Sequence, residues 1–226
     1  VGSDVYVGGG FEDAGGNPDA DHIARWDGSD WHALGTGLNG SVDTIAVVGS
    51  DVYAGGYFTA TGGGGSLDHI ARWDGAAWHP LGSGVNDAVH AVAVVGSDVY
   101  VGGSFDDAGG DAHADHIARW DGTTWHALGS GVDESVSAVA VAGADVYVGG
   151  LFHYAGENPD ADHIARWDGT AWHALGSGVN LSVRAVAVVA SDVYVGGEFQ
   201  SVGTNRNYIA RWGEGYHVHL PLIVRQ

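Results

Sequence analysis

Short apolar segments alternate along the whole chain with turns rich in glycine and aspartate. Residues 91–95 (AVAVV) form a continuous apolar run, which is typical of an inner strand covered on both faces. Gly96 and Ser97 then predict a two-residue hairpin into a strand at 98–103 (DVYVGG), which ends in a glycine pair. The pattern therefore indicates antiparallel strands joined by tight turns.

The same stretch of chain holds two further strand signals. A long polar segment at 106–115 leads into a predicted third strand at 116–120 (HIARW). An Asp-Gly pair marks a second hairpin, and 125–128 (WHAL) is expected to be the outer strand. Residues 129–135 cross to the next unit, so that one unit holds four antiparallel strands.

This four-stranded unit is repeated five times. The tripeptide Asp-Val-Tyr begins at 4, 51, 98, 145 and 192, and each step is 47 residues long. Such a period predicts a repeat architecture, in which each unit buries its apolar faces against its neighbours. A stacked solenoid would need capping units, and none is evident. We therefore expect an all-β fold, a five-bladed β-propeller of four-stranded antiparallel blades, as a single domain over 1–226.

The inner strand is the incomplete part of the repeat. It occurs four times, at 44–48, 91–95, 138–142 and 185–189. The apolar tail 220–224 (LPLIV) is a suitable substitute for the missing copy, and it would make a blade shared between the N- and C-termini. The alternative is that the tail only lengthens the outer strand of the fifth unit. We expect the shared blade.

Charge and composition narrow the classes of function. The chain has 8 basic and 28 acidic residues, a formal net charge of −20, and every basic residue is arginine. Nucleic acid and anionic membranes are therefore poor partners, whereas cations and cationic partners fit such a surface. The lack of cysteine excludes thiol chemistry, and the lack of lysine excludes Schiff-base chemistry. No apolar run is long enough for a transmembrane helix.

The start of the sequence bears on localisation. It begins at Val1 within a repeat and without methionine, which suggests a processed product that has lost a signal segment. The repeats are also acidic, rich in glycine and free of cysteine. We therefore expect an exported protein, extracellular or at the cell surface.

The repeated motifs resemble those of known propeller families. The order of an apolar strand, Y-V-G-G-x-F, a long loop, I-A-R-W-D-G and W-x-x-L resembles the kelch repeat. It is more similar still to the short propeller repeats of bacterial exported proteins and of fungal cortical-polarity surface proteins, and the similarity covers essentially the whole chain. The resemblance implies a propeller that serves as an extracellular scaffold. The chain departs from those repeats in the histidine before I-A-R-W and in its Trp-His pairs.

One face of the propeller is expected to bind ligands. In a blade of four antiparallel strands the second and fourth connections leave the same face, so the long acidic loops lie beside the loops between units. Loops displayed on a rigid scaffold commonly carry function, and we expect a protein or glycan partner on this face. The candidate ligand-binding residues are Asp13, Asp19, Asn39, Asn86, Asp107, Asp133 and Asn180, with Asp43 and His90 where inner strands begin.

An Asp-His pair enters the third strand of four units. A carboxylate beside an imidazole is metal-ligand chemistry, and nearby aspartates could supply oxygens for Ca²⁺ or another divalent cation. Equivalent pairs lie too far apart to share one ion, so any metal would be bound unit by unit. The alternative is structural, with the aspartate capping the loop and the histidine packing between blades. The candidate metal ligands are Asp21, His22, Asp68, His69, Asp115, His116, Asp162 and His163.

One repeat position near the axis carries a different polar residue in each unit. Asp43, His90, Ser137 and Arg184 follow one another there, so that an aspartate, a histidine and a serine could approach the geometry of a catalytic triad. The plainer interpretation is drift at an exposed strand entry. A second varying position holds Gly10, Tyr57, Ser104, Leu151 and Glu198.

Other recurring side chains are interpreted as scaffold. The Trp-His pairs are expected to pack between blades. The repeated arginine of I-A-R-W is expected to pair with the aspartate of Asp-Val-Tyr. Because the units are nearly identical, we expect a non-enzymatic, exported binding or display module, with sites in several equivalent copies as an option. A self-assembling subunit of a surface layer or filament, and a hydrolase with its site at the mouth of the central channel, are the alternatives.

Overall fold

The computed structural model describes residues 4–156, 158–200 and the backbone of 209–212, and these segments form five antiparallel sheets. The third sheet shows the plan: β8 (Val89–Val95), β9 (Asp98–Gly103), β10 (Ile117–Trp120) and β11 (Trp125–Ala127). The second sheet has β4 (Val42–Val48), β5 (Asp51–Gly56), β6 (Ile70–Trp73) and β7 (Trp78–Pro80). The fourth has β12 (Val136–Ala142), β13 (Asp145–Gly150), β14 (Ile164–Trp167) and β15 (Trp172–Ala174).

The first and last sheets have three described strands each. The first contains β1 (Val5–Gly8), β2 (Ile23–Trp26) and β3 (Trp31–Ala33), with the short 3-10 segment η1 (Ala14–Gly16) in its long loop. The last contains β16 (Val183–Val189), β17 (Asp192–Gly197) and β18 (Ile209–Trp212). The first sheet therefore begins at its second strand, as the repeat pattern indicated. The predicted closing strand 220–224 lies outside the described residues.

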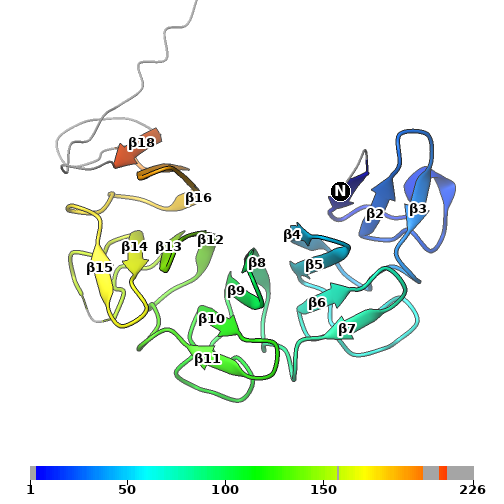
Figure 1. Ribbon diagram of the computed structural model, residues 1–226, viewed down its shortest axis with the longest axis horizontal. Helices are drawn as coiled ribbons and strands as arrows, with labels where there is room; N and C mark the ends of the chain where they lie inside the picture. Colours follow the sequence, from blue (N-terminus) through cyan, green and yellow to red (C-terminus); the bar gives the residue numbers. More distant parts are fainter. Residues whose placement is uncertain (1–3, 157, 201–208, 213–226) are drawn as a thin grey trace, which may run out of the picture.

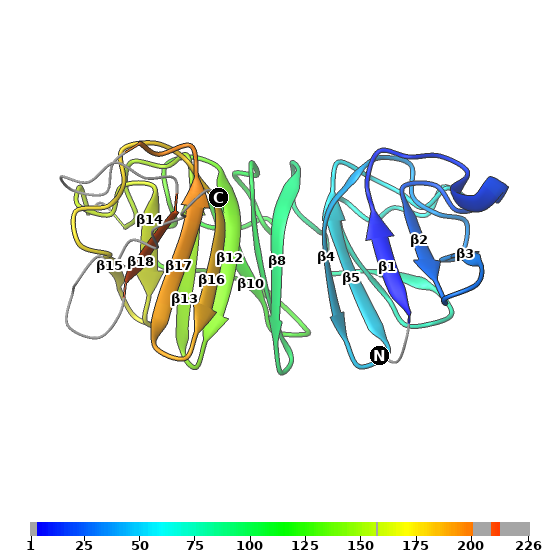
Figure 2. The same ribbon diagram turned by 90° about the horizontal axis from the view of Figure 1, so that it is seen from above.

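The five sheets stand side by side in an arc, with β4, β8, β12 and β16 toward the common centre and β7, β11 and β15 on the outside (Figure 1). Viewed from above, the inner strands run side by side along the axis of the arc (Figure 2). This is the blade arrangement of a β-propeller, so the predicted fold class is confirmed. The first and last sheets lie at the two ends of the arc (Figure 1). No helix among the described residues is long and apolar enough to cross a membrane.

The strand signals in the sequence match the sheets closely. The predicted strand 98–103 coincides with β9, and Gly96-Ser97 is the two-residue turn that pairs Val95 with Asp98. The inner strand is longer than the apolar run that revealed it, because β8 starts at Val89, before a register shift in its pairing with β9.

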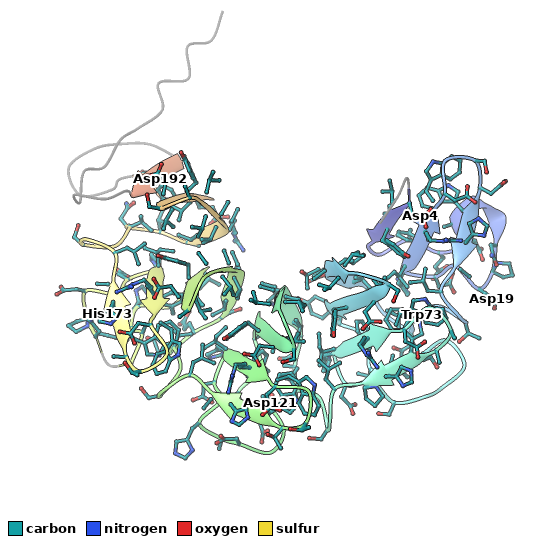
Figure 3. The ribbon with its side chains drawn as sticks, in the orientation of Figure 1. Asp4, Asp19, Trp73, Asp121, His173 and Asp192 are labelled. Carbon is teal, nitrogen blue, oxygen red and sulfur yellow. The ribbon has the colours of Figure 1, made fainter. Side chains whose placement is uncertain are left out.

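Side chains repeated in every unit fill the space between neighbouring sheets (Figure 3). The phenylalanines after the glycine pairs are fully buried in the second to fifth units, at Phe58, Phe105, Phe152 and Phe199. Glycine is required at Gly102, because a Cβ atom there would lie 2.4 Å from Cγ1 of Val136 in the next sheet. The repeat pattern thus encodes the packing between sheets.

The two residues of each Trp-His pair have different roles. Trp125 donates its Nε1–H to the carbonyl of Leu81 in the preceding sheet at 2.9 Å, so the predicted packing between blades is confirmed for tryptophan. His126 is different: its side chain is half-exposed, and its Nε2 lies 2.7 Å from Oδ2 of Asp121 in the adjacent turn. The hydrogen bond to the turn, which lies on the same sheet, explains why the histidine is not packed against a neighbouring blade.

The predicted Arg-Asp pairs are present in the first four units. Arg119 Nη1 lies 3.1 Å from Asp98 Oδ2, and both side chains remain about one-third exposed rather than buried. The equivalent pairs are Arg25–Asp4, Arg72–Asp51 and Arg166–Asp145. The side chain of Arg211, in the fifth unit, lies outside the described residues.

Candidate functional site

The long loops and the loops between units lie together on one face, which we call the loop face. The sheets place both kinds of loop on this face, because each inner strand begins beside the end of the second strand. In the third sheet, for example, Val89 at the start of β8 pairs with Gly103 at the end of β9. Backbone hydrogen bonds then join the two kinds of loop, for example from Asn86 N–H to the carbonyl of Asp107 at 3.2 Å.

The four polar residues predicted between units fasten these loops to one another. Asn39 Oδ1 accepts hydrogen bonds from the backbone N–H groups of Thr59 and Ala60, both at 2.9 Å. The equivalent acceptors, each bonded to the long loop that follows, are Asn86, Asp133 and Asn180. The structure therefore gives these residues a positioning role, and their part in ligand binding stays a prediction.

The predicted loop aspartates are also engaged in local turns. Asp107 Oδ1 accepts a hydrogen bond from the N–H of Gly110 at 2.6 Å. Asp13 has φ 52° and donates its N–H to Oδ1 of Asp21 at 2.8 Å. Asp19 donates its N–H to Oδ1 of Asn17 at 3.0 Å. These contacts order the loops and leave the carboxylates of Asp13 and Asp19 on an exposed surface.

A chain of polar side chains crosses three sheets on the axial side of the loop face. His90 Nδ1 lies 2.8 Å from Asp43 Oδ2, and His90 Nε2 lies 3.0 Å from Oγ of Ser104. Ser104 Oγ is in turn 3.1 Å from Oγ of Ser135. Asp43, His90 and Ser135 lie on the second, third and fourth sheets or immediately before them.

A matching cluster occupies the same repeat positions in the last sheet. Arg184 Nη2 lies 3.0 Å from Glu198 Oε1, and the hydroxyl of Ser182 donates to Glu198 Oε2 at 3.0 Å. The hydrogen bonds from Arg184 and Ser182 lower the pKa of the Glu198 carboxyl. We call Asp43, His90, Ser104, Ser135, Ser182, Arg184 and Glu198 the rim.

The rim changes the predicted triad in one member. The structure brings Asp43 and His90 together, as expected, but the serine that His90 contacts is Ser104 and not Ser137. The hydroxyl of Ser104 is within reach because the glycine pair ending β9 is bonded directly to the start of β8. The sequence did hold a signal for Ser104. It was the varying repeat position that contains Ser104, considered together with the varying position that contains His90.

The Asp-His pairs form the entry into the third strand. His116 has φ 59°, and its N–H donates to the carbonyl of Phe105 at 2.8 Å. Positive φ is uncommon for residues other than glycine, and here the hydrogen bond to the buried phenylalanine holds it. Positive φ recurs at His22, His69 and His163. The structural interpretation thus accounts for the histidine backbone in all four units.

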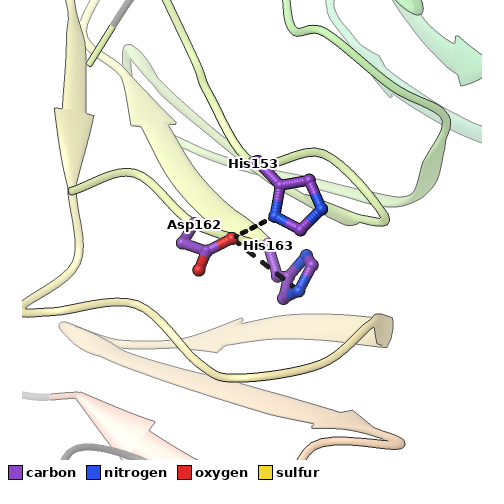
Figure 4. Close-up of side chains that lie close together, drawn as sticks. All are labelled: His153, Asp162 and His163. Carbon is purple, nitrogen blue, oxygen red and sulfur yellow. Dashed lines mark hydrogen bonds and ion pairs between the residues drawn. The ribbon is translucent and has the colours of Figure 1, made fainter. Parts of the chain in front are cut away.

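In the fourth unit a third ligand group joins the Asp-His pair. His153 Nδ1 lies 3.1 Å from Asp162 Oδ1, and His163 Nε2 lies 3.7 Å from the same oxygen (Figure 4). The two imidazole rings are 4.9 Å apart between centroids. Within the described part of the chain this is the one group of three histidine or acidic side chains close enough to hold a metal ion. His153 was not among the predicted ligands.

Two equivalent depressions lie between successive loops on the loop face. One is lined by Asp68, His69, Asn86 and Asp107. The other, one unit further on, is lined by Asp115, Asp133 and Tyr154. Several predicted site residues therefore meet at shallow surfaces that are repeated from unit to unit.

No family model matches this chain, and no curated protein matches it. Among solved structures, the computationally designed Ika4 protein is similar with a TM-score of 0.51 and 15% identity, over 79% of this chain and 94% of that one. The nidogen/laminin complex contains a chain with a TM-score of 0.54 and 13% identity, over 84% of this chain and 67% of that one. At these identities the similarity concerns the fold alone, and it supports a β-propeller.

Proposed function

We propose that this protein is a non-enzymatic binding or display module that uses the loop face of its propeller. One observation carries the proposal. Side chains repeated in every unit are used in packing and ion pairs between strands, whereas the polar side chains that vary between units meet on the rim. Loops and strand ends displayed on a rigid scaffold are the common place for binding residues.

The chemistry of the face favours a polar or cationic partner. The formal charge of −20 and the carboxylates of the long loops attract positive groups, while the rim offers donors and acceptors to hydroxyl groups. A glycan or a basic protein segment fits this description. The two equivalent depressions are compatible with more than one site per chain.

A glycan microarray and an array of basic peptides test this proposal. Native protein is expected to give saturable signals, and His90→Ala is expected to weaken them because it breaks the rim chain at its centre. Ser97→Ala, in a hairpin turn at the other edge of the third sheet, is the matched control and should bind as the native chain does. The absence of any signal on both arrays, or equal binding by His90→Ala, would contradict the proposal.

One observation favours a second candidate function. The series Asp43, His90 and Ser104 has the order and the 2.8 and 3.0 Å spacings of an aspartate-histidine-serine triad. In such a hydrolase, Ser104 Oγ would attack an ester carbonyl while His90 took up its proton. Labelling of Ser104 by a fluorophosphonate probe, abolished by His90→Ala, would establish this function in place of pure binding.

The ends of the arc favour a third use, assembly with further copies of the chain. Val5 in the first sheet is 52% exposed, whereas its equivalents Val52, Val99 and Val146 are at most 1% exposed because the preceding sheet covers them. The last sheet of a second copy offers the same kind of cover, whereas the predicted closing strand 220–224 would supply it within one chain and leave a monomer. Light scattering should then give a mass above 23.2 kDa that falls for Val5→Asp, and a monomer at all concentrations would exclude assembly.

A further inference from the structure

We infer that His153, Asp162 and His163 form a single binding site for a Zn²⁺-like transition-metal ion, confined to the fourth unit. The site stands on its own residues and would exist whether or not the loop face binds a partner. Its ligand atoms, His153 Nδ1, Asp162 Oδ1 and His163 Nε2, belong to one long loop and to the start of β14 (Figure 4).

The distances fit the geometry of a metal centre. Around a tetrahedral Zn²⁺ with bonds of about 2.0–2.2 Å, ligand atoms lie roughly 3.3–3.5 Å apart. The separations from Asp162 Oδ1 are 3.1 Å to His153 and 3.7 Å to His163. All three ligand atoms lie within 4.8 Å of one another. Rotation of the exposed His153 ring, together with a small shift of the His163 ring, would bring the three atoms to such separations.

The backbone of the two histidine ligands is already fixed. The N–H of His153 donates to Asp133 Oδ1 at 2.9 Å, in the fastening bond described above. The N–H of His163 donates to the carbonyl of the fully buried Phe152 at 2.8 Å. His163 itself is 5% exposed. An ion would therefore meet a site that is ordered by the scaffold rather than one that must be assembled.

The free nitrogen of His163 also suits a ligand imidazole. A metal-bound histidine usually donates its second ring N–H to a carbonyl or carboxylate. Nδ1 of His163 is buried and makes no hydrogen bond, while the equivalent atom of His69 lies 3.2 Å from the carbonyl of Gly56. A small shift of the ring on binding would give His163 the same bond to its own strand.

The equivalent residues of the other four units explain why only the fourth unit should bind the ion tightly. At the position of His153 those units carry Glu12, Thr59, Asp106 and Gln200. Two of their Asp-His aspartates also have other partners: Asp21 Oδ1 accepts the N–H of Asp13, and Asp68 accepts the hydroxyl of Ser66. Asp106 is bonded to Asn86. In the fourth unit the Asp162 carboxylate lies against the two histidine rings instead.

The ligand set decides the class of metal. Two imidazoles and one carboxylate suit Zn²⁺, Co²⁺ or Ni²⁺, whereas Ca²⁺ takes six to eight oxygens. The fourth position of a tetrahedral ion would remain open to water or to a donor from a partner on the loop face.

Calorimetric titration of the full chain with Zn²⁺ tests the site. The expected result is one tight ion per chain, with binding of Co²⁺ at the same site giving the visible absorption of a tetrahedral complex. His153→Thr, which introduces the residue that the second unit has at this position, should raise the Kd for Zn²⁺ by at least about tenfold. Asp162→Asn should do the same, while Asp115→Asn in the third unit is the matched control and should leave the Kd unchanged.

A second measurement, the melting temperature, distinguishes loss of the metal site from loss of the fold. Zn²⁺ should raise the melting temperature of the native chain and of Asp115→Asn, because an ion that binds only the folded state stabilises it. It should not raise that of His153→Thr, whose metal-free melting temperature should match the native one. Four equivalent ions per chain, no saturable binding, or native affinity in His153→Thr would each overturn the inference.

Discussion

Ser104 and Phe105 are neighbours in the chain but belong to two regions that follow opposite rules. Phe105 belongs to the packing between sheets, where every unit has phenylalanine and the ring is fully buried in each of the second to fifth units. Ser104 belongs to the rim, where the equivalent residues are Gly10, Tyr57, Leu151 and Glu198. We infer that the packing layer, meaning the side chains buried between sheets such as Phe105, holds the sheets together, while the rim accepts different residues at little cost to the fold.

The largest effect is expected from truncating the packing layer. Phe105→Ala should lower the free energy of unfolding by about 3–5 kcal/mol, because it removes a fully buried ring and leaves a cavity between sheets. Ser104→Ala, one residue away, should cost less than about 1 kcal/mol, the net value of a part-buried hydrogen bond. Urea denaturation of both variants checks this, and similar losses in the two would break the comparison.

The hydrogen bonds between sheets come next. Trp125→Phe keeps an aromatic ring but removes the donor to the carbonyl of Leu81. The free energy of unfolding should fall by about 1–3 kcal/mol, because that carbonyl loses its partner in the gap between sheets. A change below 0.5 kcal/mol in urea, roughly the scatter of surface substitutions, would show that the bond adds nothing to the packing layer.

Acid should weaken the turns at the outer edge of the sheets. Hydrogen bonds from Thr123, Thr124 and His126 hold the pKa of the Asp121 carboxyl far below its ordinary value. A lowered folded-state pKa gives stability that is complete above about pH 4 and is lost as the pH falls toward the folded pKa. The melting temperature should therefore fall as the pH is lowered from about 4 toward 2, and it should fall less in Asp121→Asn; an equal fall in both would contradict this explanation.

The smallest effect is expected at the repeated ion pairs. Arg119 and Asp98 are about one-third exposed, so Arg119→Gln should cost about 0.2–1 kcal/mol. The loss should shrink in 1 M salt, which screens exposed charges. Urea denaturation at two salt concentrations measures it, and a loss above 2 kcal/mol would place the pair in the packing layer after all.

The sequence predicted the period, the strands and the turn chemistry of this fold, because those features repeat every 47 residues and follow local rules. The Gly96-Ser97 hairpin and the strand 98–103 are examples. The predicted site was recovered only in part. Asp43 and His90 do meet, but Ser104 reaches His90 from another repeat position, and that contact depends on how two strands of one sheet are paired.

His153 was missed for a related reason. It is separated from Asp162 by a loop whose path cannot be read from residue spacing, and only the folded loop brings its ring beside His163. The sequence identified the four residues between units as candidates for ligand binding. It did not reveal that side chains such as Asn39 hold the loops in place. Contacts across loops could be identified only from the structure, whereas the packing between units could be predicted from the repeated sequence pattern.

The most direct test of the account uses one triple variant of the rim, Asp43→Ala with His90→Ala and Glu198→Ala, and two readings on the same sample. We expect a melting temperature within about 3 °C of the native value, which corresponds to roughly 1 kcal/mol in a domain of this size. We also expect loss of the glycan or peptide signal that the native chain gives. A variant that binds as the native chain does, or that melts far below it, would contradict the division between packing layer and rim.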